Sequence, residues 1–141
     1  MRKRMAGAIS VAMLLVGCGA SDDYANDPRP PAPRSLAVSV TNDRIAISPS
    51  RIGAGPAVLI VSNQSDTSRD VTLTPPEGSS SACVDADASS GPINPMGTAR
   101  VTVNLVEGDC ILSVRDERTP RPARLTVGTE RPSAQADLLL P

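Results

Sequence analysis

The chain has 141 residues with 14 basic and 15 acidic side chains, and it contains no histidine, phenylalanine or tryptophan. The near balance of charge argues against nucleic acid as a partner. Hydrolase triads need a base beside the nucleophile, and the chain offers no histidine and no lysine beyond Lys3, so we expect no catalytic residues and no enzyme activity.

The first 17 residues have the pattern of a secretory signal peptide. A basic start, Arg2 to Arg4, precedes an apolar or small stretch from Met5 to Val16 that only Ser10 interrupts. This stretch is shorter than the roughly 20 apolar residues that a membrane-spanning helix requires. Removal of residues 1–17 would take away three of the 14 cations and none of the 15 carboxylates, which leaves a mature chain of net charge −4.

The end of this stretch, Leu15-Val16-Gly17-Cys18, resembles the lipobox of bacterial lipoproteins. The resemblance implies that Cys18 receives a diacylglyceryl group and becomes the N-terminus after cleavage. Two acyl chains give stable membrane attachment, whereas one chain binds only marginally. We therefore expect a protein on the extracytoplasmic face of the cell membrane. Its partners would be the membrane, through the anchor, and an envelope component that the sequence does not identify.

Residues 18–35 follow as a tether that contains Pro28, Pro30, Pro31 and Pro33 among polar residues. Proline-rich segments of this kind are stiff, extended and solvated. We expect the tether to hold a folded domain away from the membrane.

Alternating apolar and polar residues then predict an all-β domain over residues 36–128. We expect residues 57–61 to form a central strand buried on both faces, residues 49–56 to form a loop, and residues 77–97 to be irregular. A disordered tail is predicted for residues 129–141. The predicted strands are 36–40, 44–48, 57–61, 70–74, 98–105, 110–114 and 123–127, with a short one at 82–84. Seven or eight short strands with frequent turns favour an antiparallel Greek-key sandwich.

Two cysteines remain once Cys18 is assigned to the lipid. Cys83 and Cys110 lie in an exported domain, where paired cysteines usually form a disulfide. A redox or metal pair is the other interpretation, but the spacing is not that of a C-x-x-C motif. We expect the disulfide to support a core that lacks large aromatic side chains.

Parts of the later sequence resemble cupredoxin-like domains. The segment Gly91 to Ala99 looks like the turn that leads into an alternating strand, and Glu107-Gly108-Asp109-Cys110 looks like the step that opens the next strand. Val61-Ser62-Asn63 is similar to the end of that family's central strand. Immunoglobulin-like sandwiches share these patterns, so both topologies remain open.

The copper site of cupredoxins does not carry over from this resemblance. A blue-copper site needs two histidines, a cysteine and usually an axial methionine, and this chain has no histidine. Met96, the only methionine of the mature chain, is interpreted as core or loop filler. The sequence therefore predicts no metal ligand and no cofactor.

The sequence leads to a lipid-anchored, non-catalytic β-sandwich that serves as a binding or structural module. The alternative is a ligand- or calcium-binding module that uses the loop of residues 85–96. Asp85-x-Asp87-x-Ser89 resembles the start of a calcium loop, but Ser90 and Met96 stand where the EF-hand pattern has glycine and glutamate.

Overall fold

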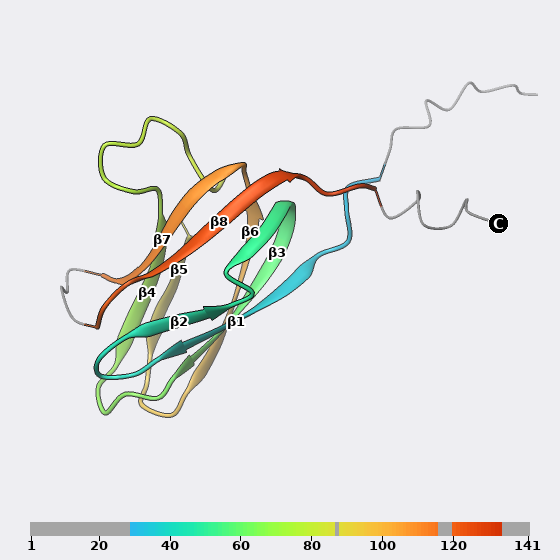
Figure 1. Cartoon of the computed structure of the whole chain (residues 1–141). Helices are drawn as coiled ribbons and strands as arrows, with labels where there is room; N and C mark the ends of the chain where they lie inside the picture. The colour runs from blue at the N-terminus through green and yellow to red at the C-terminus, as the bar shows by residue number, and fades with distance from the viewer. Residues whose placement is uncertain (1–28, 87, 116–119, 134–141) are drawn as a thin grey trace, which may run out of the picture.

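The computed structural model describes residues 29–86, 88–115 and 120–133 (Figure 1). These residues form eight strands and no helix, so nothing in the described part is a helix that could cross a bilayer. The strands are β1 (Arg34–Val40), β2 (Ile45–Ser48), β3 (Arg51–Asn63), β4 (Arg69–Thr74), β5 (Ala88–Ile93), β6 (Thr98–Leu105), β7 (Gly108–Val114) and β8 (Ala123–Glu130).

The long strand β3 belongs to both layers of the sandwich. Its first part, residues 51–54, pairs with β8, and the layer continues from β8 to β7, β4 and β5. Its second part lies between β1 and β6, with β2 on the outer side of β1. The all-β sandwich is thus confirmed, with one addition: the β1–β3 and β3–β8 pairs are parallel, so the fold is not purely antiparallel.

The core is built from aliphatic side chains that alternate along the strands. Leu36, Leu105, Leu112 and Leu125 are among the largest fully buried side chains of the described residues. Because small aliphatic residues bury less area than aromatic ones, the core is modest. This agrees with the composition of the sequence.

The strand over residues 57–61 is central, but the prediction that both of its faces are buried is wrong. Ala57, Leu59 and Val61 are buried, whereas Val58 and Ile60 are only half-buried. Burial alternates along this strand, but the sequence does not show it because both faces of the strand carry aliphatic side chains.

The predicted loop over residues 49–56 is also wrong, because β3 begins at Arg51. Gly53 and Gly55 suggested a loop, but the strand needs them for close packing. A Cβ at Gly53 would lie 2.7 Å from the carbonyl oxygen of Thr129, and one at Gly55 would lie 2.7 Å from Cγ of Pro31. Gly55 also has φ of 117°, which side-chain-bearing residues rarely adopt.

The region 77–97 was predicted to be irregular, yet it contains β5. Serine, alanine, glycine and proline give β5 no hydrophobic alternation, so pairing with β4 is what orders it. The short strand expected at 82–84 is reduced to a single antiparallel bridge between Val84 and Leu105.

The ordered domain extends past both predicted boundaries. β1 begins at Arg34 and β8 ends at Glu130, whereas the prediction placed the domain at 36–128. Pro31, within the predicted solvated tether, is buried. The two described ends lie side by side at one end of the sandwich (Figure 1) because Arg131 bonds to the carbonyl oxygen of Ala32.

Candidate functional site

Cys83 and Cys110 form the predicted disulfide, with Cα atoms 5.6 Å apart. Both residues are fully buried. The bond fastens the segment before β5 to β7, and the amide of Val106 donates to the carbonyl oxygen of Cys83 at 3.0 Å. Closing a loop of 27 residues' separation should stabilise the domain by about 3–4 kcal/mol in the chain-entropy model.

The loop of residues 85–96 does not gather the groups that a calcium site would need within its described part. Residues 88–93 are in β5, and the Ser89 hydroxyl donates to Oδ1 of Asp70 at 2.7 Å. The Asp85 carboxylate accepts a hydrogen bond from the Asn104 side chain. Asp87 lies outside the described residues. In the described ranges, no three or more His, Cys, Asp or Glu side chains come together in a way that could hold a metal ion.

Of the two interpretations of Met96, core filler is wrong and a place in a loop is what the structure shows. Its side chain is 80% exposed, and it lies in the turn between β5 and β6, where the amide of Gly97 donates to the carbonyl oxygen of Asn94 at 2.9 Å. Met96 has φ of 62°, an uncommon value for a residue with a side chain.

Asp70 is the centre of a polar cluster that joins three strands. Its carboxylate accepts from the Ser89 hydroxyl at 2.7 Å and from Nε of Arg115 at 2.8 Å. Burial by itself would raise the pKa of Asp70, but the hydrogen bonds from Ser89 and Arg115, together with the charge of Arg115, outweigh burial and lower the pKa. The cluster therefore holds a carboxylate in its ionised form beside a hollow lined by β4, β5 and β7.

A groove lies at the end of the sandwich where the described chain begins and ends. It has a volume of about 410 Å³ and is formed by the N-terminal segment, β3, the end of β6 with the turn to β7, and the end of β8. Its lining residues are Pro30, Pro31, Ala54, Gly55, Pro56, Asn104, Leu105, Val106, Glu107 and Glu130.

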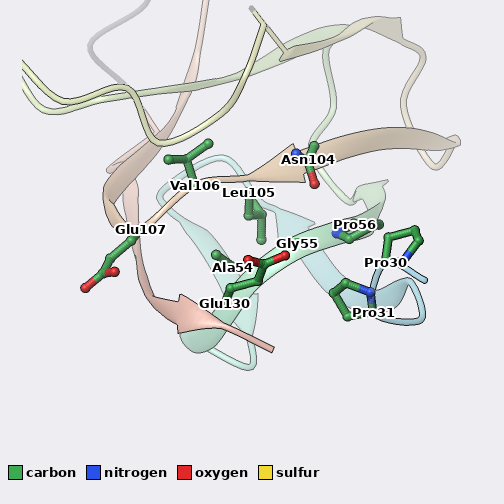
Figure 2. A pocket seen from close by; sticks show the side chains of 10 residues that line it. All are labelled: Pro30, Pro31, Ala54, Gly55, Pro56, Asn104, Leu105, Val106, Glu107 and Glu130. Atoms are coloured by element: carbon green, nitrogen blue, oxygen red, sulfur yellow. The ribbon is translucent and has the colours of Figure 1, made fainter. Parts of the chain in front are cut away.

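Figure 2 shows how these side chains are arranged. The Leu105 side chain points toward Ala54 and Gly55, and the two N-terminal prolines stand together on one side. Glu130 lies in the middle of the view, between Ala54 and the prolines, whereas Glu107 lies at the far end from the prolines. The groove thus combines an apolar lining with carboxylates from two different strands or turns.

Arg131 holds the wall of this groove in place. Its Nε donates to the carbonyl oxygen of Ala54 at 3.1 Å, one terminal nitrogen donates to Ala32 at 2.8 Å, and the other donates to the carbonyl oxygen of Pro56. Burial and the nearby Arg34 lower the pKa of Arg131, but an arginine remains charged in proteins. The guanidinium therefore fastens the N-terminal segment and the end of β8 to β3.

Sequence reasoning missed Arg131, Glu130 and Pro31 because it assigned them to a tail and a tether. The only signal was indirect: Gly53 and Gly55 in an otherwise aliphatic strand indicate that other chain segments approach closely. Cys18, the predicted lipidation site, lies outside the described residues.

Comparison with known proteins supports the fold. The chain is similar to auracyanin A, a "blue" copper protein from the green thermophilic photosynthetic bacterium Chloroflexus aurantiacus. The TM-score is 0.51 and the sequence identity is 14%, with 69% of this chain and all of auracyanin A covered. No protein-family model and no curated protein matches the sequence. The likeness shows that the domain shares the β-sandwich fold of auracyanin A.

Proposed function

We propose that the protein is a lipid-anchored lipoprotein of the cell envelope, on the extracytoplasmic face, whose cupredoxin-like domain is a non-catalytic binding module. The observation that carries this proposal is the lipobox-like Leu15-Val16-Gly17-Cys18 ahead of a proline-containing segment that leads into the fold at Arg34. The buried disulfide supports it, because structural disulfides are typical of exported proteins.

The arrangement of the chain ends fits an anchored domain. The segment that would lead from Cys18 joins the sandwich at the end where β8 stops, and Arg131 bonds it there. The groove lies at this end of the sandwich. The exposed Met96, in the turn between β5 and β6, is not part of its lining. We propose that the groove at this end, about 410 Å³ in volume, is the binding site of the module.

A copper function does not fit the residues present. A blue-copper centre uses two histidines and a cysteine thiolate, whereas this chain has no histidine and both described cysteines are joined to each other. The domain therefore shares the fold of auracyanin A, but it lacks the residues that a blue-copper centre needs. Calcium binding by residues 85–96 is less well supported, since Ser89 bonds to Asp70 and Asp85 to Asn104.

The anchor is tested by a Cys18→Ala variant. We expect the wild type to be in the membrane fraction and to leave it only with detergent, whereas the variant should lose stable attachment because it has no site for the two acyl chains. Cell fractionation with immunodetection measures this. Ser21→Ala, a change in the tether three residues away, serves as the control and should stay with the membrane. Equal membrane retention of Cys18→Ala and wild type would contradict the proposal.

A further inference from the structure

The groove at the tethered end has the size and lining of a small-molecule site. Ligand sites are concave, about 300–1,000 Å³ in volume, mostly apolar, and carry a few polar groups that orient the ligand. The groove, at about 410 Å³, falls in this range. Its apolar surface comes from Val106 and the prolines, above the buried Leu105, and its charged groups are Glu107 and Glu130.

The walls of the groove are held in position before any ligand arrives. Leu105 is fully buried, and the neighbouring Val106 amide is hydrogen-bonded to Cys83, which the disulfide holds in turn. The opposite wall, which includes Pro31, is fastened by the bond from Arg131 to Ala32. Pre-formed walls lower the ordering cost of binding.

The charge of the groove favours a cation. Both ionisable side chains in the lining are carboxylates, and both are exposed to solvent: Glu130 at the end of β8 and Glu107 in the turn between β6 and β7. Arg131, which follows Glu130, directs its three donor groups to the carbonyl oxygens of Ala32, Ala54 and Pro56. The carbonyl oxygens of Ala54 and Pro56 are therefore already paired with Arg131. A ligand in the groove would meet apolar surface and, at Glu130, a carboxylate.

We propose that this groove binds a small apolar molecule that carries an ammonium or guanidinium group. The apolar part lies against Val106 and the prolines, and the cation lies beside Glu130. The inference deepens the binding-module function proposed above and rests on it, but it does not depend on the lipid anchor.

The competing occupant is the C-terminal segment of residues 134–141, which includes Leu138, Leu139 and Leu140 and begins directly after Ser133. Its leucines match the apolar lining. Its charge does not, since Asp137 would approach Glu107 and Glu130. Charge complementarity therefore favours an external cation over this segment.

The test is a titration of the full chain carrying Cys18→Ala with three probes of equal length: hexylammonium, hexanol and hexanoate. Backbone amide signals of Gly55, Val106 and Glu107 report on the groove. We expect hexylammonium to bind about threefold more tightly than hexanol and hexanoate to bind least, a factor typical of one exposed charge pair. The preference should shrink when salt rises from about 20 mM to about 500 mM.

Variants assign this preference to the groove. Glu130→Gln should bring the affinities for hexylammonium and hexanol close to equal and leave hexanol binding unchanged. Glu107→Gln should have a smaller effect of the same kind. Glu77→Gln, an exposed carboxylate outside the lining, is the control and should change neither affinity.

Three outcomes would overturn the inference. Failure of all three probes to shift the groove amides would show that it is not a ligand site, and preference for hexanoate would show that Arg131 sets its charge. Binding that appears only after deletion of residues 134–141 would assign the groove to the chain's own tail. None of these results affects the membrane location of the wild type, so failure of the groove and failure of the anchor are told apart.

Discussion

Asp70 shows that hydrogen bonds from single polar side chains can hold a strand of this domain that lacks hydrophobic alternation. The residue lies in β4, its hydrogen-bond donor Ser89 lies in β5, and Arg115 follows β7. β5 has almost no apolar residues that could order it, and the amide of Val71 also donates to the Ser90 hydroxyl at 2.9 Å. The hydrogen bonds between β4 and the serines of β5 therefore hold β5 to the sheet, because β5 has too few apolar side chains to be held by their burial.

This contact makes stability depend on pH in a defined direction. A carboxyl whose pKa is lower in the folded state contributes stability above its unfolded pKa, near 3.8 for Asp70, and the contribution is lost as pH falls through the lower folded value. We expect Asp70→Asn to lower the unfolding free energy by about 1 kcal/mol at neutral pH. The variant should also lose stability less steeply than the wild type below about pH 4.

Denaturant unfolding followed by circular dichroism from pH 2 to pH 7 measures both effects. Asp66→Asn, at an exposed carboxylate in the β3–β4 turn, is the matched control and should follow the wild-type curve. Parallel curves for Asp70→Asn and wild type across the acid range would contradict the assigned role of Asp70.

At the scale of elements, β3 and the two chain ends form one assembly. β3 joins both layers, and its first half admits other segments only because Gly53 and Gly55 have no side chains. Arg131 fills this space: a Cβ at Gly53 would lie 2.7 Å from Cγ of Arg131. A single arginine thus completes the packing of a strand that is more than 70 residues earlier in the sequence.

Arg131→Ala should release the N-terminal segment without unfolding the sandwich. The substitution removes the donors to Ala32, Ala54 and Pro56, which should cost about 1–3 kcal/mol, and amide exchange at Ala32 and Arg34 should become faster. Hydrogen exchange measured by NMR tests this. Arg124→Ala, which removes an exposed cation 3.6 Å from Asp109, should leave Ala32 unchanged. Unaltered exchange in Arg131→Ala would show that other contacts hold the segment.

The sequence allowed correct prediction of the elements whose hydrophobic alternation is strong. In β6, Val103 and Leu105 are buried between exposed Thr102 and Asn104, as the pattern indicates. The cysteine pair could also be predicted, because compartment and count left one pairing. β5 and the first half of β3 could not be predicted, since their order comes from polar contacts and from close backbone packing with distant segments.

The candidate groove was beyond sequence reasoning for the same reason. Its residues come from four segments between Pro30 and Glu130, and none of them forms a motif in the sequence. Arg131 was assigned to a tail because it follows the last alternating strand, predicted to end at Val127. Its partners, the carbonyl oxygens of Ala32, Ala54 and Pro56, are backbone groups that carry no sequence signal.

At the scale of the whole molecule, we propose that a short segment joins a lipid anchor to a small sandwich. Pro30 follows Cys18 by twelve positions, so the groove would lie within about 40 Å of an acylated Cys18 sulfur even if the segment were fully extended. The mature chain would carry a net charge of −4. The proposed anchor would hold a small, acidic, disulfide-supported domain close to the membrane by its groove end, as the proposed binding role in the envelope requires.

The central claim is that Cys18 is the acylated N-terminus of the mature protein. The most direct test is the intact mass, and the fragment spectrum of the N-terminal peptide, of the protein purified from the membrane fraction. We predict a chain that begins at Cys18, carries a diacylglyceryl group on the Cys18 sulfur, and has lost two hydrogens to the Cys83–Cys110 disulfide. A mature chain that begins at another residue, or that has an unmodified Cys18, would contradict the account.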